Sequence, residues 1–187
     1  MTFAQGCSIE CKGCQNRHLW SKDGGFITNE KELAKYLIDL SPHGNITLSG
    51  GEILDQPEAT LSLLKHLRAL DPKLNIILYS GRTWDEIFVR LGSLLACEVL
   101  TLVDILVDGP FIVEQDDSLI TWRGSRNQRA IDAKASLIAG NVITMDWGNP
   151  EIIIDPSGDL HMPIGLSPDF SGAGKERKSR RCGQTKA

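Results

Sequence analysis

The stretch that decides the fold is the cysteine run GCSIECKGCQN, residues 6–16. It holds Cys7, Cys11 and Cys14 at the spacing C-x3-C-x2-C, and no fourth cysteine lies nearby. Thiolates are soft ligands that suit iron–sulfur clusters, and clusters that only relay electrons normally have four of them. Three thiolates therefore predict a 4Fe–4S cluster with one open iron, and an open metal position indicates chemistry, as it does on a catalytic zinc.

Two other interpretations of this run stay open from the cysteines alone. One is a zinc site in which His18 supplies the fourth ligand. The other is a ferredoxin-like cluster completed by a distant cysteine. A short motif is a hypothesis until its structural context supports it, so the remainder of the chain has to decide.

The composition is that of one globular domain. The chain has 187 residues, 41% hydrophobic and 24% charged, which is ordinary for a domain with its own core. No apolar run is long enough to cross a membrane and no signal peptide is visible, so we expect a cytoplasmic protein without a membrane contact. Five cysteines, three of them clustered, favour a metal site over a disulfide framework. We expect Cys97 to be a buried structural residue and Cys182 to have no role.

Charge is unevenly distributed along the chain. Residues 175–187 carry six Lys or Arg and one Glu, whereas the remainder carries 14 basic and 23 acidic side chains. The end of the chain is also rich in Gly and Ser, so we predict a domain of residues 1–167 and a disordered basic tail of residues 168–187. A solvated tail is the preferred interpretation, and we do not expect a nucleic-acid partner.

Between the cysteines and Pro110 the pattern alternates between helix and strand. Capping boxes at Asn29 and Thr83 and the proline at Pro57 predict three helix starts, the last helix ending near Leu94. Repeated β-α units with short connections favour an α/β fold with a parallel sheet, and three crossovers suggest a partial, open β/α barrel. Strands are predicted at 45–48, 75–79 and 103–107, and a hairpin at 152–154 with 160–162.

Helical spacing also predicts which side chains of the first two helices face the core. They are Leu33, Tyr36, Leu37 and Leu40 in the first helix, and Leu63, Leu64, Leu67 and Leu70 in the second. Residues 111–149 show few periodic runs, so no element is predicted there.

The turn Gly50-Gly51-Glu52 follows the strand at 45–48. Ligands of parallel α/β sheets bind at the carboxyl ends of the strands. Glycines there let the backbone approach a ligand closely, and exposed carbonyls with the Glu52 carboxylate can hold an ammonium group. Alone, the same three residues are also consistent with a simple strand-to-helix turn.

Three more candidates end the next two strands. Tyr79 and Ser80 follow the strand at 75–79 and are candidates to face the same ligand, although a plain turn with a half-buried tyrosine fits equally. Asp108 ends the strand at 103–107 and is predicted either to line the cavity or a partner surface, or to cap a helix or turn.

The cysteine run together with LSGGE, residues 48–52, resembles the radical S-adenosylmethionine (SAM) superfamily. The resemblance implies that the open iron is chelated by SAM and that the cluster's electron splits SAM into methionine and a 5′-deoxyadenosyl radical. It also implies that Cys7, Cys11 and Cys14 ligate the cluster, while Gly50, Gly51 and Glu52 contact SAM.

A third stretch, LVDGPFIVEQDDSLITWRGSRNQRAID at 106–132, narrows the resemblance to the family that activates the anaerobic (class III) ribonucleoside-triphosphate reductase. The resemblance covers about residues 3–133. It implies an oxidoreductase that installs a glycyl radical on a large partner enzyme, using an electron from a low-potential flavodoxin- or ferredoxin-type donor. Gly13 matches the glycine usual in this family. The matching residues Trp122, Arg123, Gly124, Ser125, Asn127 and Gln128 have two open roles, structural packing and partner docking.

Two departures and three alternatives accompany this resemblance. Family members carry about twenty more residues before the first cysteine, so Met1–Gly6 is expected to form only a stub of the first strand. Ile53 stands where relatives often have proline, a mild change. The alternatives are an activase of another glycyl-radical enzyme such as pyruvate formate-lyase, a small-molecule radical SAM enzyme, and a non-catalytic iron–sulfur or zinc protein.

Overall fold

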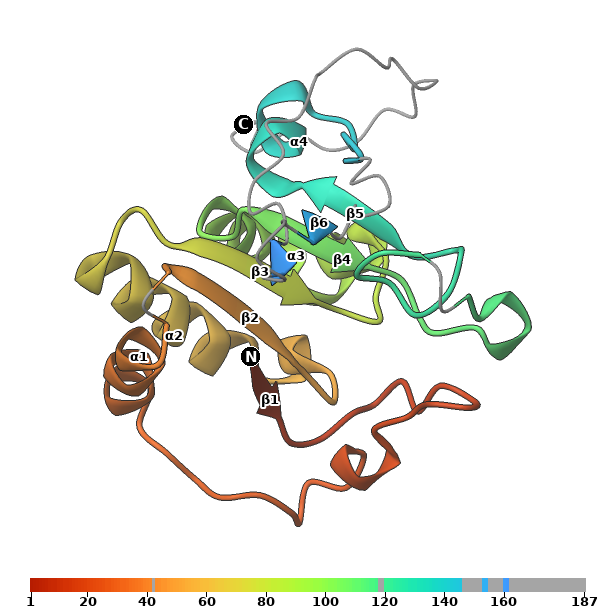
Figure 1. The fold of residues 1–187 in the computed structure, drawn as a ribbon, viewed down its shortest axis with the longest axis horizontal. Coiled ribbons are helices and arrows are strands. Elements are labelled where there is room, and N and C mark those ends of the chain that lie inside the picture. Colours follow the sequence, from red (N-terminus) through yellow and green to blue (C-terminus); the bar gives the residue numbers. More distant parts are fainter. Residues whose placement is uncertain (42, 118–119, 146–152, 155–159, 162–187) are drawn as a thin grey trace.

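The protein folds around a five-stranded sheet in the order β1-β2-β3-β4-β5 (Figure 1). The computed structural model describes residues 1–41, 43–117, 120–145, 153–154 and 160–161. The first four strands are parallel and β5 is antiparallel to β4. The strands are β1 (Thr2–Ala4), β2 (Asn45–Gly50), β3 (Asn75–Tyr79), β4 (Ile105–Asp108) and β5 (Arg129–Asp132).

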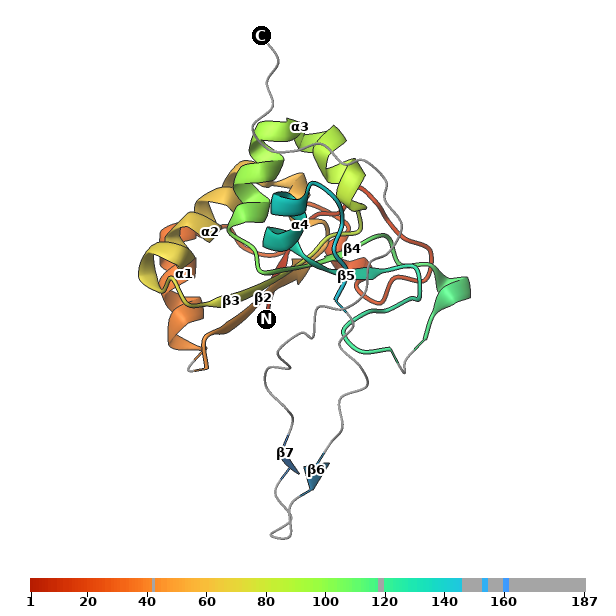
Figure 2. The same ribbon diagram turned by 90° about the horizontal axis from the view of Figure 1, so that it is seen from above.

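Four α-helices cover one face of this sheet (Figure 2). They are α1 (Glu30–Asp39), α2 (Pro57–Leu70), α3 (Trp84–Thr101) and α4 (Ala133–Ala139), with 3₁₀ turns at Arg17–Leu19, Ile53–Asp55 and Val113–Gln115. Leu48, Leu78 and Leu106 point to this face and are fully buried in the main core. Side chains alternate across a strand, so Ile77 and Val107 form a separate small cluster on the opposite face. The predicted α/β architecture with a largely parallel sheet is confirmed.

The predicted helix starts are confirmed in detail. The Asn29 side chain accepts hydrogen bonds from the main-chain N–H groups of Lys31 and Glu32. Thr83 and Glu86 form the reciprocal capping box at the start of α3. The predicted end of this helix was wrong. At Gly92 (φ 76°) the helix kinks, and it then continues to Thr101 because Ala96, Val99 and Leu100 pack into the core.

Among the described residues, the sequence analysis missed one strand, β5, and one α-helix, α4. Both are short, so neither repeats an apolar period often enough to be recognised in the sequence. β5 is specified by its pairing with β4, which no local pattern reveals. α4 begins at an N-cap, Asp132, whose carboxylate accepts the N–H of Ala135, and ends at Gly140 (φ 71°).

The predicted core faces were wrong at three positions. Tyr36 and Leu40 of α1 and Leu70 of α2 are exposed. Ala34 of α1 is fully buried instead, because α1 packs against α2 and the small side chain of Ala34 lies on the packed face. Cys97, predicted to be buried, is only half-buried and packs against the core.

The ends of the chain complete the fold. β1 pairs with β2 at the sheet edge through Thr2–Ala4, so a short strand forms before the first cysteine, as predicted. The predicted hairpin is confirmed as β6 (Ile153–Ile154) paired with β7 (Leu160–His161). The predicted basic tail, residues 168–187, and its boundary with the domain lie outside the described residues.

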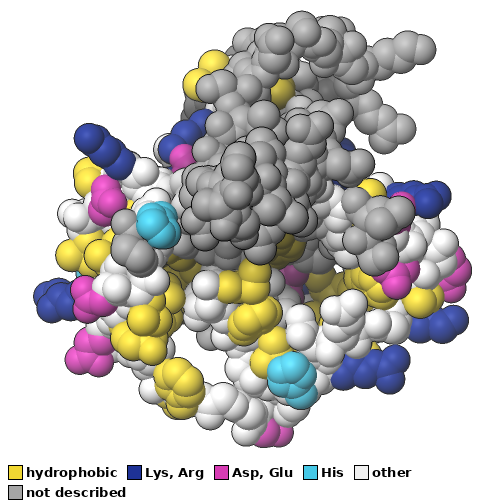
Figure 3. All heavy atoms as spheres, in the orientation of Figure 1, with side chains coloured by type: hydrophobic (Ala, Val, Ile, Leu, Met, Phe, Trp, Pro, Cys, Tyr) yellow, Lys and Arg dark blue, Asp and Glu magenta, His cyan; other side chains and the backbone are white. Residues whose placement is uncertain are grey.

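The surface view gives no strong electrostatic division on the visible face (Figure 3). Acidic and basic side chains are interspersed around the edge of the described part of this face, and hydrophobic side chains lie between them. Of the helices that the structure describes, none combines the length and apolarity needed to span a bilayer.

Candidate iron–sulfur and cofactor site

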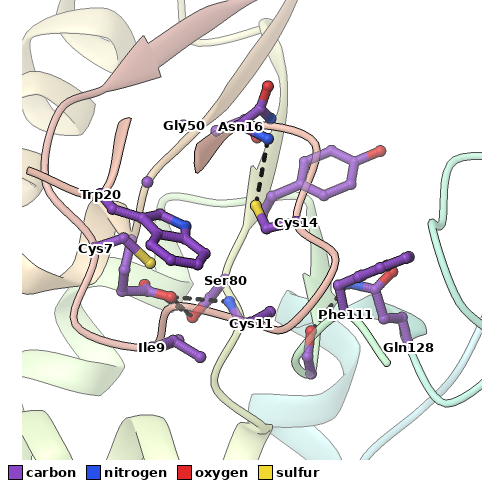
Figure 4. Close-up of a pocket in the computed structure, with 16 residues that line it drawn as sticks. Cys7, Ile9, Cys11, Cys14, Asn16, Trp20, Gly50, Ser80, Phe111 and Gln128 are labelled. Atoms are coloured by element: carbon purple, nitrogen blue, oxygen red, sulfur yellow. Dashed lines mark hydrogen bonds between the residues drawn. The ribbon is translucent and has the colours of Figure 1, made fainter. Parts of the chain in front are cut away.

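A cavity of about 160 Å³ lies where the carboxyl ends of the parallel strands meet the cysteine loop, residues 7–14 (Figure 4). Parallel strands place their following turns at one edge of the sheet, which is why motifs far apart in the sequence converge here. The cavity is lined by all three cysteines and by five of the six other predicted site residues: Cys7, Cys11, Cys14, Gly50, Gly51, Glu52, Tyr79 and Ser80.

Main-chain hydrogen bonds tie the start of the cysteine loop to the segment that follows it. Gly6 donates its N–H to the carbonyl of Leu19 at 2.8 Å, and Cys7 donates to the carbonyl of Trp20 at 3.0 Å. Cys14 closes a turn by donating to the carbonyl of Cys11 at 3.0 Å. These bonds fix the backbone on either side of the thiols and leave the thiols themselves directed at the cavity.

A polar network holds the middle of the same loop. Asp55 accepts both the N–H and the hydroxyl of Ser8, at 2.7 and 2.8 Å. Arg82, from the turn before α3, donates to Asp55 and to Ser8 at 2.8 Å. Burial alone would raise the pKa of Asp55, but the hydrogen bonds from Ser8 and Arg82 outweigh it and lower the pKa. The loop between the first two cysteines is therefore pinned by an ion pair.

The three thiols fit a cluster better than a single metal ion. Within the described residues, no three His, Cys, Asp or Glu side chains lie close enough to hold one metal ion. A tetrahedral zinc needs every sulfur within about 2.3 Å of one point, whereas a 4Fe–4S cluster is held by thiolates spread around its body. His18 is exposed and does not line the cavity, so the structure does not support it as a fourth ligand.

The thiols also influence one another. Burial raises the pKa of the Cys11 thiol, the main-chain N–H of Phe111 opposes that rise, and the neighbouring Cys7 and Cys14 add to it. Cys14 accepts the N–H of Asn16 at 3.3 Å. Three sulfurs close enough to repel one another electrostatically are an arrangement that a positively charged iron core relieves.

The glycines of the Gly50-Gly51-Glu52 turn are required by the chain itself. A Cβ at Gly50 (φ 128°) would overlap the backbone of Ala4, and one at Gly51 would overlap the carbonyl of Gly6. Gly51 and Glu52 donate their N–H groups to those same two residues, at 2.8 Å each. The sequence analysis expected close approach to a ligand, and the structure adds close approach of the strand that leads into the cysteine loop.

Glu52 is fully buried and anchors the turn. Its carboxylate accepts the N–H of Leu54 at 3.0 Å, the N–H of Gly81 at 2.8 Å and the hydroxyl of Ser80 at 3.0 Å. Burial raises the pKa of Glu52, and these hydrogen bonds oppose the rise, as does the charge of Arg82. Glu52 thus joins the end of β2 to the end of β3 while one side of it borders the cavity.

Tyr79 frames the cavity from β3. Its hydroxyl donates to the carbonyl of Trp122 at 2.6 Å, and burial raises its pKa to about 12. The side chain is therefore neutral at physiological pH.

Asp108 does not line the cavity. It is fully buried, accepts the N–H of Trp84 at 2.7 Å and forms an ion pair with Arg129 (Nε to Oδ1, 2.9 Å). Of the two roles predicted for Asp108, the structure places it as a cap at the start of α3, tied to β5.

The W-RGS-NQ stretch folds into a loop that bonds mostly to itself. Gln128 accepts the N–H groups of Gly124 and Ser125, at 2.8 and 3.2 Å, and donates to the carbonyl of Gly109 at 2.9 Å. Asn127 donates to the carbonyl of Pro110 at 2.7 Å and accepts the hydroxyl of Ser125 at 2.7 Å. Of the two roles left open by the sequence, these contacts favour structural packing.

Sequence reasoning missed several cavity residues, of which Trp20 is the most informative. Its indole Nε1 is buried and has no hydrogen-bond partner. An unsatisfied buried donor costs roughly 1–3 kcal/mol, so such a group in a cavity suggests an acceptor that the cavity would hold. No spacing rule singles out this residue, because Trp20 follows Cys14 in a stretch without periodicity.

The comparisons with known proteins agree with this geometry. Residues 1–131 match the family described as "4Fe-4S single cluster domain". The anaerobic ribonucleoside-triphosphate reductase-activating protein of Vibrio cholerae is 34% identical over 132 residues, which is 67% of this chain and 82% of that protein. The protein of that name from Escherichia coli K12 is 31% identical over the same shares.

This chain belongs to the family of anaerobic ribonucleoside-triphosphate reductase-activating proteins. Membership confirms the predicted class, a radical SAM enzyme, and its two cofactors, a 4Fe–4S cluster and SAM. A shorter match links the activating family to a second one: the pyruvate formate-lyase-activating enzyme of Clostridium pasteurianum is 39% identical over 70 residues, 29% of its length. No solved structure matches the chain.

Proposed function

We propose that this protein is the activase of an anaerobic ribonucleoside-triphosphate reductase and installs a glycyl radical on that enzyme. The observation that carries the proposal is that three thiols, none paired in a disulfide, line the same cavity as the Gly50-Gly51-Glu52 turn. A sheet with helices on one face and a cavity at the strand ends also suits the partial β/α barrel of radical SAM enzymes, which we propose as the fold type.

In this proposal each site residue has a role. Cys7, Cys11 and Cys14 ligate three irons of the cluster. Gly50, Gly51 and Glu52 border the methionyl end of SAM, and Tyr79 and Ser80 border the remainder of it. When bound, the cluster and SAM supply a carbon-centred radical that abstracts a hydrogen atom from glycine. Asp108 acts from a distance, by holding the start of α3 against β5.

The partner is proposed from the extent of the similarity. The reductase-activating relatives align over 82% of their length, whereas the pyruvate formate-lyase-activating enzyme aligns over 29% of its length. We therefore propose the large anaerobic reductase as partner, a flavodoxin- or ferredoxin-type protein as electron donor, and the cytoplasm as the compartment. A pyruvate formate-lyase-type enzyme is the second candidate partner, favoured by the higher identity of the shorter match, 39%.

Electron paramagnetic resonance (EPR) tests the cofactor half of the proposal. The protein is reconstituted anaerobically with iron and sulfide, reduced, and measured with and without SAM. We expect a reduced 4Fe–4S signal that changes when SAM is added, because SAM binds the open iron. A cluster signal that SAM leaves unchanged, or no cluster, would favour the non-catalytic interpretation.

Mixing experiments test the partner half. The loaded protein, SAM and a reductant are added separately to an anaerobic reductase and to pyruvate formate-lyase, and the glycyl radical is quantified by EPR. We expect a radical on the reductase only. A radical on pyruvate formate-lyase alone would replace the proposed partner with the second candidate.

A further inference from the structure

The indole N–H of Trp20 is a hydrogen-bond donor without an acceptor at the edge of the cysteine cavity. Its nitrogen is buried and unpartnered, while the ring lines the cavity together with Cys7 and Cys14 (Figure 4). Buried polar groups in proteins nearly always have a partner, so an orphan beside a cofactor cavity indicates where an acceptor would sit.

The main chain of Trp20 is held against the cysteine loop. The carbonyl of Trp20 accepts the N–H of Cys7 at 3.0 Å, and the carbonyl of Leu19 accepts the N–H of Gly6 at 2.8 Å. The Arg17 guanidinium lies over the ring, 5.7 Å from its centre. These bonds hold the main chain of Trp20 next to Cys7, and Figure 4 draws the indole beside the Cys7 side chain.

We propose that the Trp20 indole N–H donates a hydrogen bond to a sulfur of the 4Fe–4S site, either the Cys7 thiolate or a sulfide of the cluster. This bond raises the reduction potential of the cluster. The inference rests on the proposed function, since it requires the cluster. Hydrogen bonds to the sulfurs are among the factors that set cluster potentials. The reduced cluster carries one more negative charge and accepts the bond more strongly, so the bond favours reduction. Trp20 is thus a tuning residue and takes no part in the reaction itself.

The test compares Trp20→Phe with the matched variant Trp122→Phe. Phenylalanine keeps an aromatic ring in the cavity and removes only the N–H donor. Trp122 is exposed and does not line the cavity, so the same replacement there leaves the site unchanged. Midpoint potentials are measured by EPR-monitored redox titration of reconstituted protein, normalised to iron content and without SAM.

We expect Trp20→Phe to shift the midpoint potential to a more negative value, so that the ratio of reduced to oxidised cluster at the wild-type midpoint falls roughly fivefold. Trp122→Phe should match the wild type. Equal potentials in Trp20→Phe and wild type would overturn the inference and leave the proposed function standing. A wild-type protein that assembles no cluster would overturn both.

A second measurement covers the case in which Trp20→Phe does not fold or load. Wild type and Trp122→Phe are labelled with ¹⁵N in the tryptophan indole, and the reduced cluster is examined by pulsed EPR for ¹⁵N coupling. Coupling in both proteins supports the inference, and its absence from both overturns it. Coupling that appears only after SAM is added would also overturn it, because the acceptor would then be the SAM carboxylate.

Discussion

Two loops meet at the cavity, and their polar groups are used in opposite ways. In the cysteine loop the thiols receive only main-chain N–H groups, from Asn16 to Cys14 and from Phe111 to Cys11, and all three line the cavity. In the loop of residues 109–128, the side chains of Ser125, Asn127 and Gln128 are bonded within the loop. Both are sequence motifs, but only the first lines the cavity with thiols. The difference indicates that the cysteine loop carries the reactive groups and that the second loop has a structural role.

The two loops nevertheless depend on each other. Gly13 (φ 82°) leaves room for Phe111 and Val113, since a Cβ at Gly13 would lie 3.1 Å from Val113 Cγ2. Each loop also holds one non-glycine residue at positive φ, Glu10 at 51° and Trp122 at 62°. Such conformations persist when the surrounding structure enforces them. The second loop therefore shapes the first, although it bonds mainly to itself.

The largest expected effect comes from removing a ligand. Cys11→Ala should abolish both the cluster and SAM cleavage, because two thiolates do not hold a 4Fe–4S cluster. Iron and sulfide content and methionine release measure the two losses. Cys182→Ala is the control and should change neither. Loss of the cluster in Cys182→Ala would show that the three-cysteine assignment is wrong.

Glu52→Ala should destabilise the connection between the ends of β2 and β3 by about 3 kcal/mol, because the buried N–H groups of Leu54 and Gly81 lose their acceptor. The effect should depend on pH. Burial raises the pKa of Glu52, so its contribution to stability is complete below the unfolded-state pKa and declines as the pH rises through the folded-state pKa. The free energy of unfolding, from urea titrations across acidic to neutral pH, should differ most between the two proteins in acid. A difference that grows with pH would contradict this assignment.

Gln128→Ala tests whether the second loop has only a structural role. It removes three hydrogen bonds and should cost about 2 kcal/mol, mostly as local loosening of the loop. Amide hydrogen exchange should accelerate at Gly124 and Ser125, while the cluster still forms. If Gln128→Ala loses the cluster as completely as Cys11→Ala, the division between a reactive and a supporting loop is wrong.

Tyr79→Phe is expected to have the smallest effect. It removes the hydroxyl that donates to the Trp122 carbonyl and leaves the ring in place, at a cost of about 1 kcal/mol. Urea denaturation of the apo-protein measures this loss. Because burial raises the pKa of Tyr79 to about 12, the loss should not vary between neutral pH and pH 9. A variation in that range would indicate a titrating tyrosine and contradict the assigned environment.

Local signals predicted the elements that local chemistry specifies. Thr83 forms the predicted capping box, and Asn29 caps its helix without the reciprocal bond from Glu32; both caps were visible in the sequence because a cap involves only neighbouring residues. The strand at 75–79 was predicted to the residue, since a continuous apolar run is buried on both faces. β5 was missed because its four residues are specified by pairing with β4, a contact made across the loop of residues 109–128.

The sequence by itself determined the cysteine spacing, the glycine turn and hence the family and its cofactors, because these depend on residue type and short separations. Only the tertiary structure decided what each side chain does there. It showed that Gly50 is required by the backbone of Ala4, that Glu52 joins two strand ends and that Asp108 caps α3. It also showed that the buried indole nitrogen of Trp20 has no hydrogen-bond partner. These roles arise from contacts between residues far apart in the chain, which parallel strands bring to one edge of the sheet.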